Sequence, residues 1–457
     1  MSQPSSAAAA TLHNSSYPPP AVGWYATLVL ALLYWLSILD RFIISLMVDP
    51  IKRDLGINDV QFGMLHGLAF ALTYSLLGLA AGSLADRFNR RRIIFGCVAI
   101  WSLATAACGL AQNFVHMLLA RVGVGAGEAG LNPCATSMLT DLFPRERLTS
   151  AMAVYAIGAT IGSGTAYLFG GAIVQMVAQT ATVAIPLVGD VRSWQAVFFV
   201  IGIPGALLSF VVFTFPEPVR KGRAGLAAGQ RSGFWRGLFL GYRDLLRFMR
   251  PRWRFFACHY GGFALASVVL AGSAIWYPAH MGRSFGWEPS QIGVGLGLTM
   301  VVAGITGKLV GGWAVDAMYR RGQHDAQLRW YAGCMVVATP VGIIATTSGN
   351  PYIFLAGAGT FIALMATLPA CSAAALNLIT PNELRGTGVA FFAATAGLVG
   401  SATGPILIAA ISDHVYGGPE FIGRGMATAI ALCCPLGAIV MAFGCRHMRS
   451  AMAQAID

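Results

Sequence analysis

The sequence predicts an all-α membrane protein, with twelve transmembrane helices in two pseudo-symmetric six-helix bundles. Of its 457 residues, 56% are hydrophobic and only 11% are charged, whereas an average soluble domain carries about 25% charged residues. The apolar residues form blocks of the length that crosses a bilayer core as a helix. In addition, the loops between these blocks repeat in the two halves of the chain.

In lipid, only helices and closed barrels satisfy the hydrogen bonds of every backbone group. The apolar blocks are too long for barrel strands, so we predict helices. In the N-terminal half we place spans near residues 24–48, 62–85, 93–111, 114–140, 150–178 and 194–214. In the C-terminal half we place them near residues 255–279, 291–315, 329–347, 352–379, 387–412 and 425–445.

These spans divide the chain into five parts. We predict a disordered cytoplasmic N-terminal tail, an N-terminal bundle, a basic cytoplasmic linker, a C-terminal bundle and a cytoplasmic C-terminal tail, at residues 1–22, 23–214, 215–254, 255–446 and 447–457. The first tail carries no Lys, Arg, Asp or Glu, whereas a signal peptide begins with a positive region. We therefore expect no cleavable signal peptide.

The net charge of +12 does not indicate nucleic-acid binding, because the basic residues lie in short loops between apolar blocks. Most of the 30 Lys and Arg residues fall on the side that holds both termini and the linker. Cytoplasmic loops carry such an excess of basic residues. We therefore expect an integral protein of the inner or plasma membrane with both termini in the cytoplasm.

A loop motif follows span 2 and recurs after span 8. It places a Gly, an Asp and two Arg residues at the same spacing, as Gly82, Asp86, Arg90 and Arg91 and as Gly312, Asp316, Arg320 and Arg321. Arg87, which follows Asp86, occurs in the first motif alone. The glycine allows two helices to approach closely, and an Asp at a helix end can face the positive N-terminus of another helix.

By the symmetry of the repeat, Asp86 would face span 11 and Asp316 would face span 5. Such contacts would hold the cytoplasmic side shut in the outward-open state. We interpret seven residues of the two motifs as a conformational gate: Gly82, Asp86, Arg87, Arg90, Gly312, Asp316 and Arg320.

Four charged residues lie deep inside spans of the N-terminal half: Asp40, Arg41, Arg121 and Glu128. Charges at this depth are costly and are functional candidates by default. Arg121 and Glu128 share a helix face, because seven residues make about two turns. We predict one cluster in which the two arginines bind an anionic substrate and the two carboxylates couple protons. A purely structural ion-pair network between spans 1 and 4 is the alternative.

The mechanism expected of such a cluster is competition. An anionic head displaces a carboxylate from Arg41 or Arg121, and the displaced carboxylate then takes up a proton because a lone charge is costly in a low dielectric. Lys308, placed near the cytoplasmic end of span 8, is expected to extend its ammonium group toward the membrane surface. A role in substrate binding is the alternative for this residue.

The loop at residues 82–92 resembles the signature loop of the major facilitator superfamily, Gly-x-x-x-Asp-Arg-x-x-Arg-Arg. Within that superfamily, the first 170 residues resemble the Spinster family of lipid transporters. The resemblance rests on Leu39-Asp40-Arg41, Gly82 to Arg90, Arg121 to Ala129, Asp141-Leu142-Phe143 and Ala156 to Tyr167.

The resemblance implies alternating access and a substrate such as sphingosine-1-phosphate or a lysophospholipid, proton-coupled in some members. The charged site of the family would fall on Asp40, Arg41, Arg121 and Glu128. A proton-linked carrier of small organic anions, such as sugar acids, is the competing interpretation.

A membrane enzyme or a receptor is a more distant alternative. The eight His residues are scattered without the spacing of metal ligands or of a nucleophile and its base. We therefore expect no enzyme activity, no cofactor and no metal. The expected partners are an amphipathic lipid or organic anion, protons and the bilayer, with no nucleic acid, and we expect a monomer.

Overall fold

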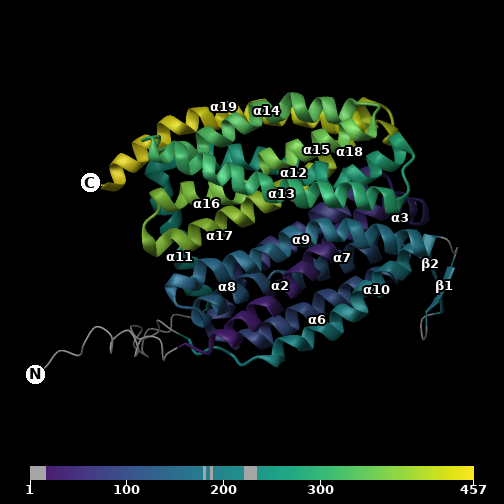
Figure 1. Ribbon diagram of the computed structural model, residues 1–457, viewed down its shortest axis with the longest axis horizontal. Helices are drawn as coiled ribbons and strands as arrows, with labels where there is room; N and C mark the ends of the chain where they lie inside the picture. The colour runs from purple at the N-terminus through teal and green to yellow at the C-terminus, as the bar shows by residue number, and fades with distance from the viewer. Residues whose placement is uncertain (1–16, 179–181, 186–188, 221–233, 457) are drawn as a thin grey trace, which may run out of the picture.

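Long helices lying side by side make up almost all of the computed structural model (Figure 1). It describes residues 17–178, 182–185, 189–220 and 234–456. Side chains at positions 82, 83, 86, 87, 145, 234–241, 382, 383 and 453–456 lie outside this description. The start of α2 and the end of α19 lie on the same side of the molecule, which we call the terminal side. The opposite side, which carries α3 and the two strands, is the far side.

The N-terminal half contains six membrane-crossing stretches and a short hairpin of strands. Its helices are α2 Pro20–Ile43, η1 Ile44–Met47, α3 Val48–Leu55, α4 Asp59–Gly63, η2 Met64–Leu68, α5 Ala69–Arg87, α6 Arg90–Cys108, α7 Phe114–Glu128, α8 Leu131–Leu142, α9 Arg145–Ala178, α10 Ser193–Leu208 and η3 Ser209–Thr214. The strands β1 Thr182–Ile185 and β2 Gly189–Arg192 pair antiparallel, with Val183 opposite Val191. The sequence analysis did not predict this hairpin, which lies in the loop between two spans.

The C-terminal half repeats this plan after a helix in the linker. Its helices are α11 Phe234–Met249, η4 Arg250–Arg252, α12 Trp253–Phe285, α13 Pro289–Arg320, α14 Ala326–Thr347, α15 Pro351–Met365, α16 Leu368–Ile379, α17 Asn382–Leu398, η5 Val399–Thr403, α18 Gly404–Ala410, η6 Ile411–Val415, η7 Pro419–Phe421 and α19 Ile422–Ile456. The residues predicted as a C-terminal tail thus continue α19 up to Ile456.

Within the described residues, eleven helical stretches are long and apolar enough to cross a membrane. The predicted span 114–140, which is divided into α7 and α8 at Ala129-Gly130, is not among them. The corresponding stretch of the second half is divided in the same way into α15 and α16. Each broken span consists of 15 residues followed by 12, which supports duplication of one six-helix unit.

The buried apolar side chains form three large clusters whose positions describe how the halves meet. One cluster lies within the terminal part of the N-terminal half and includes Trp101 and Met138. A second lies within the terminal part of the C-terminal half and includes Phe263 and Tyr331. The third is shared by both halves on the far side. The halves are therefore joined through one core on the far side and keep separate cores toward the terminal side.

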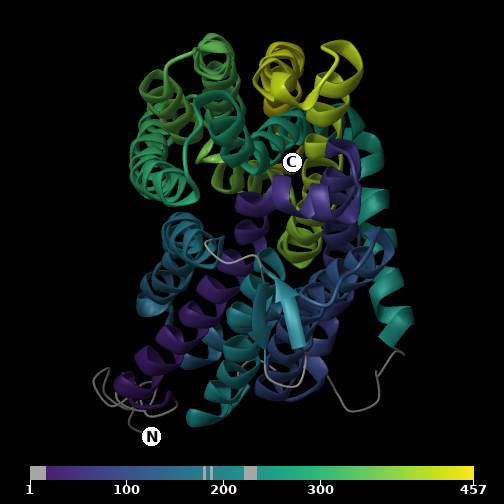
Figure 2. The same ribbon diagram turned by 90° about the vertical axis from the view of Figure 1, so that its right-hand side faces the viewer.

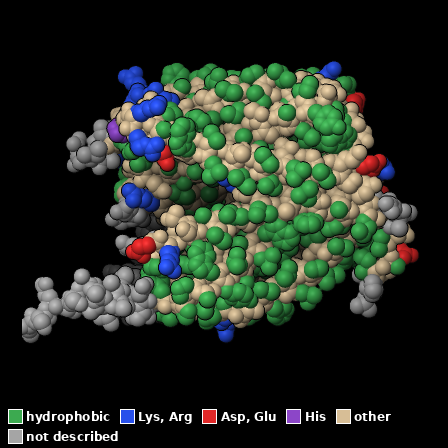
Figure 3. All heavy atoms as spheres, viewed as in Figure 1, with side chains coloured by type: hydrophobic (Ala, Val, Ile, Leu, Met, Phe, Trp, Pro, Cys, Tyr) green, Lys and Arg blue, Asp and Glu red, His purple; other side chains and the backbone are tan. Residues whose placement is uncertain are grey.

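Close backbone contacts between α9 and α13 seal the shared part of this interface. A Cβ atom on Gly171 would lie 2.4 Å from the carbonyl oxygen of Pro289, and one on Gly293 would lie 2.4 Å from that of Tyr167. Only residues without a side chain permit this approach. Figure 3 shows a hollow between the halves that lies toward the terminal side. Figure 2 looks at the far side, where the purple segment with α3 lies against the C-terminal half.

Candidate functional site

Arg41 and Glu128 form an ion pair at the level where α7 ends. Arg41 extends from α2 and donates to one carboxylate oxygen of Glu128, and the Oγ of Ser37 donates to the same oxygen at 2.6 Å. The guanidinium also lies 4.5 Å from the ring centre of Phe70 and 5.1 Å from that of Tyr74. The second carboxylate oxygen of Glu128 has no hydrogen-bond partner among the described residues.

Asp40, although adjacent in sequence, contacts a different set of groups. It is fully buried, and one of its oxygens accepts a hydrogen bond from Thr105 on α6 at 2.7 Å. Its other oxygen has no hydrogen-bond partner in the described part of the chain. Arg121, Glu128 and Arg41 all lie within electrostatic reach of this carboxylate.

Arg121 is fully buried on α7. None of its three guanidinium nitrogens has a hydrogen-bond partner among the described residues, and its nearest aromatic neighbour is Phe70, with the ring centre 5.7 Å away. A buried cation with unused donors is costly unless an anion satisfies it. The arrangement is thus suited to accept an anionic group.

The structure brings the four predicted residues together, but it does not pair them all. Among the described residues, Arg41 and Glu128 form the one ion pair of the four, while Asp40 is bound to a hydroxyl and Arg121 has no hydrogen-bond partner. The sequence analysis placed these groups in one cluster and could not assign their partners, because rotamers decide which carboxylate each arginine reaches.

His66 is a further member of this site that the sequence analysis missed. It lies in η2, a π-helical segment between α4 and α5, and it is 6% exposed. Arg121 and Arg41 both lie within its electrostatic reach, and its Nδ1 has no partner among the described residues. Single π-turns inside helices are frequent at functional sites. A titratable residue within an apolar span was the available signal.

An apolar cavity of about 370 Å³ lies beside the charged groups. Phe42, which follows Arg41, forms part of its wall, and Ser163 on α9 contributes a hydroxyl. Most of the remaining wall comes from the C-terminal half, namely Ser267, Leu270, Ala271, Ala274, Tyr277, Met300, Ile362, Leu368, Ala396, Gly397, Gly400 and Ser401. The cavity therefore has its charged neighbours on one half and an almost uncharged wall on the other.

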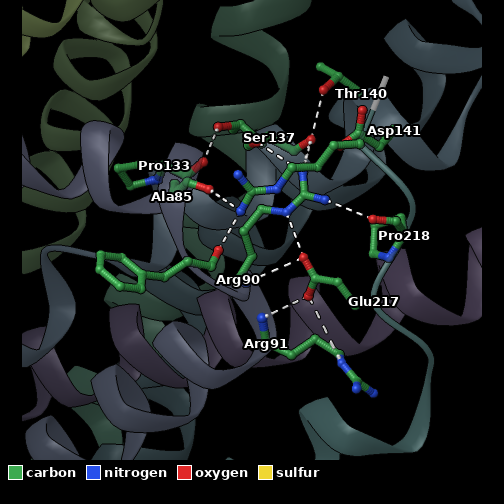
Figure 4. Close-up of polar contacts among 12 residues, drawn as sticks. Ala85, Arg90, Arg91, Pro133, Ser137, Thr140, Asp141, Glu217 and Pro218 are labelled. Carbon is green, nitrogen blue, oxygen red and sulfur yellow. Dashed lines mark hydrogen bonds and ion pairs between the residues drawn. The ribbon is translucent and has the colours of Figure 1, made fainter. Parts of the chain in front are cut away.

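Of the predicted gate, Arg90 is the residue that the structure describes most fully. Its guanidinium lies between three elements and donates to Asp141 at 2.5 Å, to Glu217 at 2.9 Å and to the carbonyl oxygens of Ser137 and Pro218 (Figure 4). It is 1% exposed. Ser137 and Asp141 belong to α8, whereas Glu217 and Pro218 stand at the start of the linker, so Arg90 fixes α6, α8 and the start of the linker to one another.

The other gate residues are placed less tightly. The side chains of Gly82, Asp86 and Arg87 lie outside the described residues. Gly312 has open space where a Cβ would stand, so no helix approaches it closely in this arrangement. Arg320 is exposed at the end of α13, and Asp316 lines a surface cavity of about 470 Å³ that also includes Arg385 from the same half.

On the far side, a charged network joins the two halves, which the sequence analysis did not anticipate. Arg283, near the end of α12, donates to Asp49 at 2.6 Å and to Asp59 at 2.7 Å, and also to the carbonyl oxygen of Pro419. Asp59 is buried and is paired with Lys52 as well. Together with the glycine contacts between α9 and α13, this network holds the far side closed.

Comparison with known proteins gives a consistent family. The chain matches the Major Facilitator Superfamily over residues 30–316. It is 28% identical to an MFS-type efflux pump of Mycolicibacterium smegmatis, over 92% of both chains. It is 27% identical to human protein spinster homolog 1, over 91% of this chain and 79% of that protein. A hexuronate transporter of Bacillus subtilis is 25% identical, over 87% of this chain and 90% of that protein.

A solved structure described as a bacterial homolog to the human lysosomal transporter Spinster, in an inward-facing and unoccupied conformation, superposes with a TM-score of 0.74. It is 24% identical and covers 96% of this chain and 98% of that chain. The predicted fold class is thereby confirmed. The sequence is similar to those of the spinster proteins, and the protein belongs to the major facilitator superfamily.

Proposed function

We propose that the protein is a proton-coupled secondary carrier of single-chain anionic lipids, of the sphingosine-1-phosphate or lysophospholipid type, working by alternating access. The observation that carries the proposal is the adjacency of a buried cationic site and an apolar cavity. Arg41 belongs to the site and the next residue, Phe42, lines the cavity. An amphipathic anion has the two parts that such neighbours would bind.

The head of the lipid would bind at Arg121. The guanidinium is buried and its donors are unused among the described residues. A phosphate accepts several hydrogen bonds from an arginine, and such charged bonds are the strong ones. The apolar tail would occupy the cavity, whose wall is built mainly by side chains such as Leu270, Ala274 and Met300. Ligand sites are commonly of this kind, mostly apolar with a few placed polar groups.

Proton coupling would follow from competition for Arg41. A phosphate that approaches Arg41 weakens the ion pair with Glu128, and the carboxylate would then carry an uncompensated charge in a low dielectric. Neutralisation by a proton removes that cost. Asp40 and His66 lie within the electrostatic reach of Arg121 and offer further positions for a proton.

The orientation belongs to the proposal as well. With the termini in the cytoplasm, as the distribution of basic residues indicates, the hollow toward the terminal side opens to the cytoplasm (Figure 3). The closed far side then faces the exterior. The protein would have bound or released its substrate on the cytoplasmic side in this arrangement.

A proton-linked carrier of small organic anions is the second candidate. The arginine pair and the similarity to a hexuronate transporter favour it. A sugar acid has no apolar tail to fill the apolar cavity, and for this reason we prefer the lipid.

The test is transport in liposomes that contain a pH-sensitive dye. Wild-type protein is expected to move protons on addition of lysophosphatidic acid but not of glucuronate. Asp40→Asn and Glu128→Gln should abolish the substrate-dependent signal. Asp190→Asn, at an exposed position in β2, is the matched carboxylate control and should behave as wild type.

Proton flux with glucuronate alone would replace the lipid proposal by the organic-anion alternative. If labelled lipid still moved in both carboxylate variants and no proton moved in wild type, the coupling would be disproved and the charged cluster would be structural.

A further inference from the structure

Lys308 is a charged residue that neither the charged cluster nor the predicted gate includes. It lies near the middle of α13, and its Nζ donates to the Oγ1 of Thr160 at 2.7 Å. Thr160 lies near the middle of α9, in the other half of the protein. The ammonium group therefore reaches from one half to the other. The sequence analysis had instead expected it to extend toward the membrane surface.

No carboxylate among the described residues forms an ion pair with Lys308. A cation at this depth is costly without a counter-charge, and a threonine hydroxyl supplies only a neutral acceptor. The nearest acidic residue along α13 is Asp316, eight positions on and therefore about 12 Å away along the helix. Lys308 is also exposed, so an anion from outside the protein can reach it.

The position of Lys308 connects it to the apolar cavity. Met300 lines the cavity, and Gly304 and Lys308 follow at intervals of four residues, so the three share one face of α13. A Cβ on Gly304 would lie 3.5 Å from the methyl group of Thr160. On α9, Ser163 lines the cavity one turn from Thr160. The pair therefore lies at the terminal end of the cavity wall.

The same pair lies where the tight contact between α9 and α13 ends. Gly164, one turn along α9, packs so closely on α13 that a Cβ would lie 2.2 Å from Val301. Beyond Lys308, toward the terminal side, the halves separate into the hollow seen in Figure 3, in which a basic side chain is visible. A ligand that enters through this hollow meets Lys308 before it reaches the sealed part of the interface.

We propose that Lys308 is a specificity-determining residue of the carrier: it exchanges its bond with Thr160 for the anionic head of the lipid as the head passes between the hollow and the arginine site. The inference rests on the proposed function and adds a second head position to it. Arg121 and Lys308 would hold the head in turn, while the tail stays in the apolar cavity.

The experiment measures equilibrium binding of labelled lysophosphatidic acid to the full-length protein in phosphatidylcholine nanodiscs. An uncharged monoacylglycerol of the same chain length serves as competitor. Lys308→Gln should lower the affinity for lysophosphatidic acid about tenfold, the order of one charged hydrogen bond, and leave that for the monoacylglycerol unchanged. Lys308→Arg should retain most of the affinity. Arg254→Gln, an exposed position at the start of α12, should have no effect.

Thr160→Val separates a ligand contact from a simple latch between the halves. If Lys308 binds the head, removing the competing hydroxyl should preserve or raise the affinity. If the pair is only a latch, Thr160→Val and Lys308→Gln should change the binding of both lipids alike, and the proposal fails. If wild type binds no lysophosphatidic acid, the proposed function fails. If Arg121→Gln weakens binding and Lys308→Gln does not, only this inference is overturned.

Discussion

The broken helices of the two halves have the same lengths, but their side chains at the break are charged in one half and apolar in the other. In the N-terminal half, α7 ends at Glu128, and in the C-terminal half α15 ends at Met365. Glu128 is paired with Arg41, whereas Met365 is buried in an apolar cluster. Seven residues earlier in each helix, the chain has Arg121 in one half and Ala358 in the other.

The difference shows that duplication preserved the helix break and not the charge. The break in the N-terminal half carries the ion pair of Glu128 with Arg41. The break in the C-terminal half is buried among apolar side chains, and Ile362 and Leu368, which lie on either side of it, line the cavity. The asymmetry of the proposed substrate, with a charged head and an apolar tail, corresponds to the asymmetry of the two walls.

The largest expected effect is a loss of stability on replacing Glu128, at the break of the N-terminal half, by Met, the residue at the corresponding break of the C-terminal half. Glu128→Met leaves the charge of Arg41 without its partner, which should lower the free energy of unfolding by about 3–5 kcal/mol. Met365→Leu, a change of similar volume on the other side, should lower it by less than about 1.5 kcal/mol. Thermal unfolding of the purified protein measures both.

Adding Arg41→Met to Glu128→Met should recover most of that stability, because no unpaired charge remains, and should not recover transport. Equal unfolding temperatures for Glu128→Met and Met365→Leu would contradict the view that charge distinguishes the two breaks.

A smaller effect, on substrate binding and not on stability, is expected at Arg121, whose counterpart in the C-terminal half is Ala358. Arg121→Gln should weaken the binding of lysophosphatidic acid about tenfold or more, since bonds to charged groups are worth about 1.5–3 kcal/mol. The unfolding temperature should stay the same or rise, because the guanidinium donates no hydrogen bond to the described residues. Arg121→Lys retains the charge and should lose less affinity. A fall in unfolding temperature with unchanged binding would make Arg121 structural.

The smallest effect is expected at the interface between α9 and α13, where each half contributes a glycine to the close contact. A side chain at Gly171 would collide with α13, and overpacking of this kind costs about 1–3 kcal/mol. Gly171→Val should therefore shift the population toward molecules that are open on the far side. Gly78→Val, at a position with open space, is the control.

Spin labels at the exposed positions Arg53 and Glu288 would report the far-side distance, after replacement of the nine native cysteines. An unchanged distance distribution in Gly171→Val would show that the glycine contact does not set the conformation.

The sequence predicted the helices, the repeat and the four buried charges, because each leaves a pattern in hydropathy, spacing or composition. It did not predict which partner each charge takes. Asp40 and Arg41 are neighbours, yet they point to Thr105 and Glu128. Nor did it predict the network around Arg283, whose carboxylate partners lie more than 200 positions away. Such contacts depend on how the two halves pack against each other, and a hydropathy pattern does not predict that packing.

The apolar core shared on the far side has a consequence for the transport cycle. To open that side, the protein must divide the cluster that contains Phe62 and Trp276, which belong to different halves. Water would then reach surfaces that are dry now, and the lost burial must be replaced by new contacts on the terminal side or by the cargo itself. If the substrate is the lipid proposed above, its apolar surface would replace part of that lost burial and so reduce the free-energy cost of opening the far side.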